Sequence, residues 1–288
     1  MDEKQKTAGD RRARVTVLGA RGSMPVSGRQ YQIYGGATSC VLLETGIDSD
    51  CSSQAVIFDA GSGIMNLPER IWRQHAKVHV FLSHFHLDHL IGIPMSRMLF
   101  DETAEVIFYA QDGDQIRGAI RQMMKEPLWP VGPDAFCAKI GYRSLDGQPV
   151  ILDEMSGGAP VKISAMQVAH PGGAVAFRAD WDDHSMVYAT DCDPVGESVH
   201  ALADFAAGTD LFILDAQYTD VEYERCRGFG HSSIRTASQL IASSHAKQGR
   251  LFHHAPDHTD THMVELERQV QQYREYISFS REGERIII

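Results

Sequence analysis

Short runs of apolar residues, separated by turn-forming residues, recur along the whole chain and predict that β-strands form much of the fold. Strands are expected wherever aliphatic or alternating apolar side chains cluster over four to eight positions. The predicted strands are 14–18, 39–44, 55–58, 78–82, 105–110, 138–142, 149–152, 161–168, 175–179, 185–189, 211–214 and 250–252, with 277–280 and 285–288 as one strand or a hairpin.

Helices are predicted between these strands. In residues 112–126 the apolar side chains recur at helical spacing, which indicates a helix with one buried face. The loop that follows is rich in proline. Strands and then helices occur twice along the chain, which favours one α/β domain over residues 13–288 with two sheets covered by helices. Residues 1–12 are polar and are expected to be a flexible segment. The other expected helices are 64–75, 92–100, 232–246 and 260–276.

The segment after the predicted strand 78–82 carries four potential metal ligands in six residues. It reads His84-Phe-His86-Leu-Asp88-His89 and has no low-complexity flank. Three imidazoles and one carboxylate suit zinc, manganese or iron. On a loop leaving a strand, His84 and His86 can bind one ion while Asp88 and His89 face a neighbouring one. The spacing therefore predicts two divalent ions about 3.5–4 Å apart, able to activate water and polarise a phosphoryl or acyl oxygen.

A site for two ions needs further ligands, and three candidates lie where other predicted strands end. They are His170, Asp191 and His254. Each is a weak signal alone, since a strand-end aspartate is often a turn former. As an ordered set they supply the missing groups. His253 precedes His254 directly, and because successive strand residues face opposite sides, only one of the two can face the ions.

Composition narrows the classes of function. The formal charge of −11 over 288 residues argues against a broad nucleic-acid groove, which would be lined by Lys and Arg. A small anionic substrate stays compatible, because bound cations would dominate the local field. No apolar run is long enough to span a bilayer, and the charged N-terminus has no apolar signal segment. Five scattered cysteines without a CxxC pair favour a reduced, cytoplasmic protein.

Taken in order, these residues resemble the metallo-β-lactamase superfamily of metal-dependent hydrolases. The resemblance begins at Asp59 in Asp-Ala-Gly-Ser-Gly and extends over nearly the whole chain. It implies an α/β fold built as a four-layer αββα sandwich with mixed sheets. It also implies that Asp59 supports the metal loop without being a ligand. The implied ligands are His84, His86 and His170 for the first ion, Asp88, His89 and His254 for the second, and Asp191 as the bridge.

Two glycine-rich segments, 18–25 and 34–40, are similar to the phosphodiesterase branch of this superfamily. That branch holds phosphoribosyl cyclic phosphodiesterases and, more distantly, tRNA 3′-processing endonucleases. The segment 228–233 is similar to the branch's later histidine motif, which implies that His231 acts on the scissile phosphate. The alternative is a structural histidine beside serines that cap a helix. The candidate catalytic residues are thus His231 and Asp88, and Asp215 is a strand-end acid whose role stays open.

The resemblance implies hydrolysis of a small phosphodiester, cyclic ones included, by attack of a hydroxide that bridges the two ions. The expected cofactors are two divalent ions, Zn²⁺ or Mn²⁺, and iron also fits the ligand set. The expected partner is the small substrate, with no membrane and no nucleic acid. Homodimers are common in the branch, so the resemblance also implies a homodimer of this chain.

Three other functions stay open. A tRNA 3′-processing endonuclease would need a basic arm, and no Lys/Arg-rich insertion of that kind is found. A thioesterase or lactamase on the same fold is disfavoured by the glycine-rich segments. A non-catalytic metal-binding sensor would not need the full ligand set, which is intact here.

Overall fold

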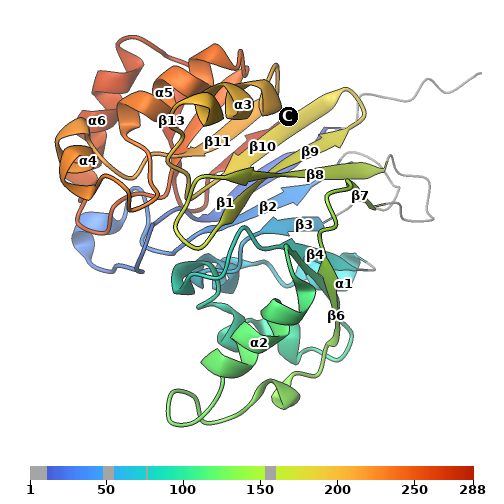
Figure 1. The fold of residues 1–288 in the computed structure, drawn as a ribbon. Helices are drawn as coiled ribbons and strands as arrows, with labels where there is room; N and C mark the ends of the chain where they lie inside the picture. Colours follow the sequence, from blue (N-terminus) through green and yellow to red (C-terminus); the bar gives the residue numbers. More distant parts are fainter. Residues whose placement is uncertain (1–11, 48–54, 76, 153–159) are drawn as a thin grey trace, which may run out of the picture.

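The computed structural model describes residues 12–47, 55–75, 77–152 and 160–288 (Figure 1). The segment 1–12, expected to be flexible, lies outside these residues except for its last position. Within the described ranges the chain forms two sheets of seven strands each. Every strand predicted from the apolar pattern is present, with bounds that differ by a few residues.

The first sheet is built from the N-terminal half of the chain and closed by the C-terminal strand. Its strand order is β14-β1-β2-β3-β4-β5-β6. The pairs from β3 to β6 are parallel, and β14, β1, β2 and β3 pair antiparallel. The strands are β1 (Arg14–Gly19), β2 (Cys40–Glu44), β3 (Ala55–Phe58), β4 (Val78–Phe81), β5 (Glu105–Ala110), β6 (Lys139–Ser144) and β14 (Arg285–Ile287).

The second sheet has the order β13-β12-β11-β10-β9-β8-β7. The pairs from β10 to β13 are parallel. The expectation that the two C-terminal segments form one strand or a hairpin is wrong, because β13 pairs with β12 and β14 pairs with β1 in the other sheet. The strands are β7 (Val150–Leu152), β8 (Val161–Val168), β9 (Ala174–Trp181), β10 (His184–Ala189), β11 (Leu211–Asp215), β12 (Gln248–Phe252) and β13 (Ile277–Phe279).

The helices agree less closely with the sequence pattern. The helix expected over 64–75 is two pieces, a 3-10 helix and α1, with Pro68 between them. The helix expected over 92–100 is two 3-10 turns. Two further helices, α3 and α4, were not predicted. The α-helices are α1 (Arg70–Gln74), α2 (Gly113–Met123), α3 (Glu197–Phe205), α4 (Asp220–Cys226), α5 (Ile234–Ser243) and α6 (Asp260–Gln271).

Three apolar clusters show that the molecule has four layers. The first lies between the first sheet and α1 and α2, and includes Trp72 and Ile116. The second lies between the two sheets, where Phe58 and Phe177 are in contact. The third lies between the second sheet and α3, α5 and α6. Full burial of one such side chain contributes about 1.5–3 kcal/mol. The predicted αββα sandwich is confirmed, and Figure 1 shows the helices on the two outer sides.

The parallel strands bring several strand ends to one edge of the sandwich. Strands β10, β11 and β12 run in the same direction, so the residues after Ala189, Asp215 and Phe252 lie side by side. The segment after β4 approaches the same edge from the first sheet, since Val175 donates its N–H to the Ser83 carbonyl. This edge positions the candidate site. No helix in the described ranges is both long and apolar enough to cross a bilayer.

Candidate metal centre

The histidine-rich segment starts where β4 ends and is held there by a buried carboxylate. Asp59, just after β3, accepts hydrogen bonds from the Ser83 backbone N–H (2.7 Å) and hydroxyl (2.8 Å). A 3-10 helix, η3 (Leu87–His89), then turns Asp88 and His89 into the interior, where both are buried. The sequence prediction that Asp59 supports this loop agrees with these contacts.

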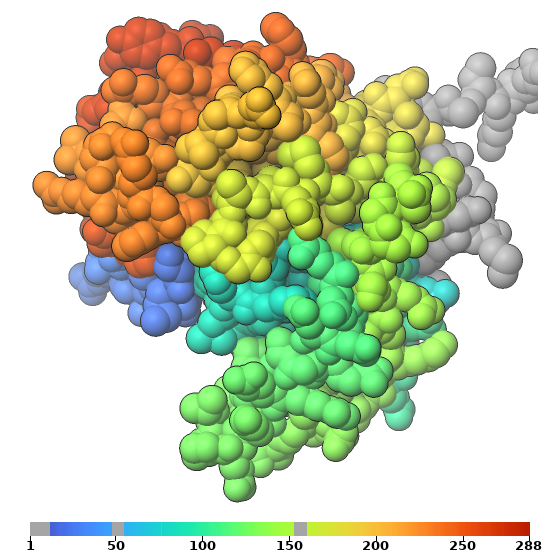
Figure 2. All heavy atoms as spheres, viewed as in Figure 1, coloured from blue at the N-terminus to red at the C-terminus, as the bar shows by residue number. Residues whose placement is uncertain are grey.

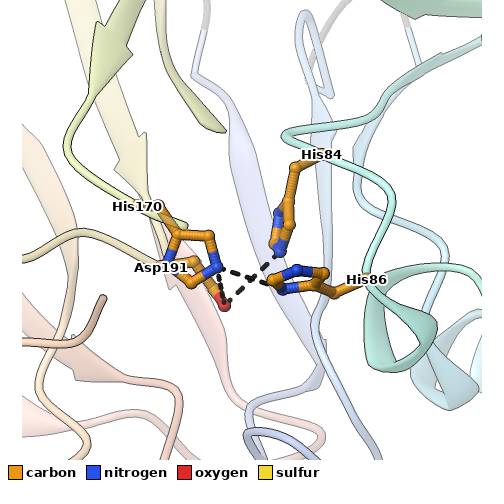
Figure 3. Close-up of side chains that lie close together, drawn as sticks. All are labelled: His84, His86, His170 and Asp191. Carbon is orange, nitrogen blue, oxygen red and sulfur yellow. Dashed lines mark hydrogen bonds and ion pairs between the residues drawn. The ribbon is translucent and has the colours of Figure 1, made fainter. Parts of the chain in front are cut away.

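A first group of ligand atoms forms around the end of β8. His84 and His86 from the segment after β4, His170 from the segment after β8, and Asp191 from just after the end of β10 point toward one another (Figure 3). The Nε2 atom of His170 lies 3.1 Å from Nδ1 of His86 and 3.8 Å from Oδ2 of Asp191. His84 Nε2 lies 3.6 Å from the same carboxylate oxygen.

A second group lies on the other side of Asp191 and contains Asp88, His89 and His253. Oδ1 of Asp191 is 3.1 Å from Nε2 of His89 and 3.1 Å from Nε2 of His253. Asp88 Oδ2 lies 3.3 Å and 3.1 Å from the same two nitrogens. Asp191 thus offers one carboxylate oxygen to each group, as a bridging ligand does.

The residues present fit two divalent ions. Donor atoms bound at about 2.0–2.1 Å to one tetrahedral ion lie roughly 3.3 Å apart, close to the separations in both groups. The Nε2 atoms of His84 and His89 are buried and have no hydrogen-bond partner among the described residues. A buried polar atom without a partner is costly, and a cation at the centre of each group would satisfy it.

The imidazole rings are oriented from behind by hydrogen bonds at Nδ1. Nδ1 of His89 lies 2.8 Å from Asp59, that of His170 lies 2.9 Å from the Gly230 carbonyl, and that of His253 lies 2.8 Å from Oε1 of Gln217. Because all three partners are acceptors, the proton of each neutral ring belongs on Nδ1, and Nε2 is left as a ligand. Such outer partners are typical of metal-binding histidines.

Electrostatics keep the two carboxylates ionised. Burial alone would raise the pKa of Asp88, but His89 and His253 beside it hold that pKa well below its usual range. Burial likewise opposes ionisation of Asp191, yet His253, His89 and His84 lower its pKa. Both side chains are therefore available as anionic ligands across the physiological pH range.

The structure corrects the choice between the two adjacent histidines: the prediction that His254 faces the ions is wrong. His254 points away, donating from Nε2 to the Ser280 carbonyl (2.8 Å) and packing on Phe279. His253 faces the second group instead. The physical reason is that β12 ends at Phe252 and His253 adopts a left-handed conformation with φ 62°, which breaks the alternation of a strand.

His231 lies where the two groups meet and is paired with Asp215. Its Nδ1 donates to Asp215 Oδ2 (2.8 Å), and its ring stacks on His253 with centroids 4.8 Å apart. Asp215 is fixed in turn by the backbone N–H groups of Ser232 (2.8 Å) and Asp191 (3.1 Å). Although burial opposes the charge, Asp215 raises the pKa of His231 to about 9.

The glycine-rich segment after β1 packs directly on the second group. A Cβ on Gly22 would lie 2.5 Å from Nδ1 of His253, so only glycine fits. The N–H of Ser23 donates to Asp88 Oδ2 (2.8 Å). Arg21 points the other way and donates to the carbonyls of Ala255 and His258 (both 2.9 Å). The segment therefore shapes the metal centre.

Two residues of the site were missed by sequence reasoning. Gln217 orients His253, and Tyr188 donates its hydroxyl to Asp59 (2.8 Å). Gln217 belongs to no motif, and only its position two residues after Asp215 could have drawn attention to it. Tyr188 lies within an apolar strand, where its hydroxyl gives no separate signal.

A pocket of about 240 Å³ opens beside the first group. Phe85, His86 and Pro171 form part of its wall, and Gln111 and Gln115 form another part. None of the side chains that line it is a carboxylate, lysine or arginine. The side-chain amides of the two glutamines make no hydrogen bond with any described residue, so they are available to a ligand. In Figure 2 the yellow-green atoms of the segment between β8 and β9 lie above teal and green atoms from the N-terminal half of the chain.

Known proteins resemble the chain in sequence and in fold. The family described as "Beta-lactamase superfamily domain" matches residues 54–254, which include both ligand groups. Ribonuclease Z of Haloferax volcanii is 22% identical over 284 residues, covering 83% of this chain and 84% of that protein. Ribonuclease Z of Haloarcula marismortui is 23% identical over 296 residues, covering 83% and 85%.

Solved structures show the same fold. A metallo-beta-lactamase fold protein of Bacillus subtilis, YhfI, superposes with a TM-score of 0.68 at 18% identity, covering 96% of this chain and 99% of that one. A diphosphatase from the PhnP family gives 0.64 at 19% identity, covering 96% and 97%. The short form of human tRNase Z gives 0.60 at 17% identity, covering 95% and 98%.

Proposed function

The chain belongs to the beta-lactamase superfamily, and from this premise we propose that it is a two-metal hydrolase of small phosphodiesters. One observation carries the proposal: a single carboxylate, Asp191, is shared by two ligand groups, and a His231–Asp215 pair lies beside it. A shared carboxylate and an adjacent proton donor are what hydrolysis of a stable ester requires.

The residues that would hold the ions follow from the geometry. The first ion would be held by His84, His86, His170 and Asp191, and the second by Asp88, His89, His253 and Asp191. When bound, the two ions supply Lewis-acid polarisation of a phosphoryl oxygen and activation of a water nucleophile. A mixed set of imidazole and carboxylate ligands suits zinc or manganese.

His231 is the residue placed to handle a proton. With Nδ1 committed to Asp215, its Nε2 is the atom left to donate. Its pKa of about 9 means that the ring carries this proton at neutral pH, and proton donation to the leaving oxygen is the role it fits. Asp215 holds the ring in place and stabilises its charged form.

The surroundings favour a small substrate over a long polyanion. The pocket beside His86 has a volume of about 240 Å³, enough for one small organic group, and its lining side chains include no cation to follow a phosphate backbone. Two of the relatives are named for phosphate chemistry, a diphosphatase and a ribonuclease. We infer a phosphodiester with one compact substituent, cyclic diesters included.

A second candidate is an endoribonuclease acting at RNA 3′ ends. It is favoured by the curated relatives named ribonuclease Z, which align over 83% of this chain. The net charge of −11 disfavours it.

A substrate panel tests the proposal. We expect protein loaded with zinc or manganese to hydrolyse bis(p-nitrophenyl) phosphate and a cyclic nucleotide or ribose cyclic phosphate, and His84→Ala to abolish this. His200→Ala, which changes an exposed histidine of α3 that belongs to neither ligand group, serves as the matched control. Turnover of nitrocefin or a thioester alone would contradict the proposal. Turnover of a tRNA precursor with no small diester would select the ribonuclease instead.

A further inference from the structure

A separate cluster of metal-ligating side chains lies where α4, α6 and the loop before α6 meet. Glu222 belongs to α4, His258 to the loop and His262 to the first turn of α6. Each offers one ligand atom, and these atoms lie within 4.8 Å of one another. We propose that these three side chains form an additional zinc site that fixes α4 to the loop carrying His253.

The geometry of the cluster is close to that of a bound ion. Nε2 of His258 lies 2.9 Å from Oε1 and 3.1 Å from Oε2 of Glu222, near the roughly 3.3 Å that separates two ligands of tetrahedral zinc. The rings of His258 and His262 meet edge to face with centroids 4.8 Å apart. A hydrogen bond explains why Glu222 and His258 are close. It does not explain why His262 also lies against His258.

The spacing of the ligands also matches a zinc site. His258 and His262 are separated by three residues, within the spacing found between paired zinc-binding histidines. With Glu222 they give two imidazoles and one carboxylate, which leaves a fourth position for water. His258 is buried, and His262 is exposed and gives an ion a path from solvent.

The carboxylate is already held in place. Glu222 is the N3 residue of α4, and its Oε2 accepts hydrogen bonds from the Thr219 N–H (2.7 Å) and hydroxyl (2.8 Å). Among the described residues, His258 is the only hydrogen-bond partner of Glu222 Oε1. One carboxylate oxygen thus fixes the helix start, and the other is free to bind an ion with little loss of side-chain entropy.

Helix α4 has a particular need for such a site. None of its seven residues is buried. A helix this short without an apolar face gains almost nothing from the core and is marginal alone. Its contacts to the rest of the molecule are polar, for example the Tyr223 hydroxyl donating to Asp193 (2.8 Å). An ion shared with His258 and His262 would join it to α6.

The site would also stiffen the loop that starts at His253. Arg21 clamps this loop by donating to the Ala255 and His258 carbonyls, and the Gly22 N–H donates to the His254 carbonyl. Zinc at His258 would add a second anchor at the far end of the loop. The inference does not depend on the proposed activity, since the ion is measured without turnover.

Metal content tests the site directly. The full-length protein is equilibrated at fixed free zinc, and bound zinc per chain is measured by mass spectrometry of the eluted metal. We expect His262→Ala, a change at an exposed position, to bind one zinc ion fewer than wild type. His200→Ala, another exposed helix histidine, should match wild type. Glu222→Gln, which keeps the hydrogen-bond acceptor, should also bind one ion fewer.

Hydrogen exchange of α4 gives a second readout. At free zinc of 100 times the dissociation constant, amide exchange in residues 220–226 that requires α4 to open should slow by about 100-fold in wild type. The same exchange in His262→Ala should not slow. Equal zinc content in wild type and His262→Ala would overturn the proposal. So would an amide exchange rate of α4 in wild type that does not change when zinc is added.

Discussion

The two ligand groups share Asp191, yet they differ in how the fold encloses them. In the first group His86 is exposed and faces the pocket of about 240 Å³. In the second group all of Asp88, His89 and His253 are buried. The first group is reached from solvent, whereas the second is closed by the segment that contains Gly22.

This difference in burial indicates that the two ions have different roles. A ligand set whose members are buried and oriented from behind should hold its ion tightly and exchange it slowly. A set with an exposed member can exchange its ion and admit a substrate oxygen. We therefore assign substrate entry to the side of the first group and the more permanent ion to the second.

The largest effect is expected from removing what the groups share. We predict that Asp191→Ala loses both ions and at least about 10³-fold in kcat/KM, because each ion supplies several kcal/mol of transition-state stabilisation. Metal analysis together with diesterase kinetics checks this. Retention of an ion by either of the two groups at wild-type affinity, beyond any ion held at His258, would show that the groups are independent and that Asp191 is not a bridge.

The next effect concerns His231, which touches both groups and is assigned to neither ion. We predict that His231→Ala keeps its metal content and loses about 10²-fold or more in kcat. Because the pKa of His231 is raised to about 9, the ring is protonated below that value, and wild-type kcat should fall as the pH rises through it. A pH–rate profile of both proteins checks this. An alkaline limb that persists in His231→Ala, or loss of metal there, would contradict the assignment.

A smaller effect is expected from changing Asp59, a hydrogen-bond partner that lies behind the metal-facing side chains. Asp59 contacts Nδ1 of His89 in the second group directly (2.8 Å). It reaches the first group only through the Ser83 hydroxyl, which donates to Asp59 and lies 3.0 Å from Nδ1 of His84. We predict that Asp59→Asn weakens the second ion by about 10- to 100-fold and the first ion by less. Metal titration with a competing chelator measures both constants. Equal weakening of both ions would remove the distinction between the groups.

The smallest effect comes from a matched pair of glycines. A Cβ at Gly22 would collide with His253, and one at Gly172 would meet His86 Nε2 at 3.9 Å, an ordinary contact. We predict that Gly22→Ala weakens the second ion by about tenfold. Gly172→Ala should cost only about 1 kcal/mol of stability from its φ of 85°. Thermal unfolding and the same titration check the pair. Weakening of the second ion by Gly172→Ala, with no such effect of Gly22→Ala, would contradict the role given to Gly22.

Much of the fold could be predicted because several of its strands are unbroken apolar runs, as in 211–214 and 55–58. The pairing partner of 285–288 could not, since a strand at the end of the chain joins a sheet by contacts distant in sequence. Helix α4 was missed for a physical reason. It has no buried residue, so it leaves no apolar stripe for a periodicity argument to find.

The site divides in the same way. The block from His84 to His89 was recognisable because its ligands lie within one loop and follow a strand. The choice between His253 and His254 was not, because it depends on one left-handed residue just past the end of β12. Gln217 and Gly22 position the ligand set through their contacts with His253, and the local sequence around either residue does not show that contact.

Anomalous diffraction from zinc-loaded crystals is the most direct test of two ions held across Asp191. At this centre we predict two zinc peaks about 3.5–4 Å apart, one among His84, His86 and His170 and the other among Asp88, His89 and His253, with a carboxylate oxygen of Asp191 toward each. A single peak beside Asp191 at full zinc occupancy, or a peak bound by His254, would contradict this arrangement.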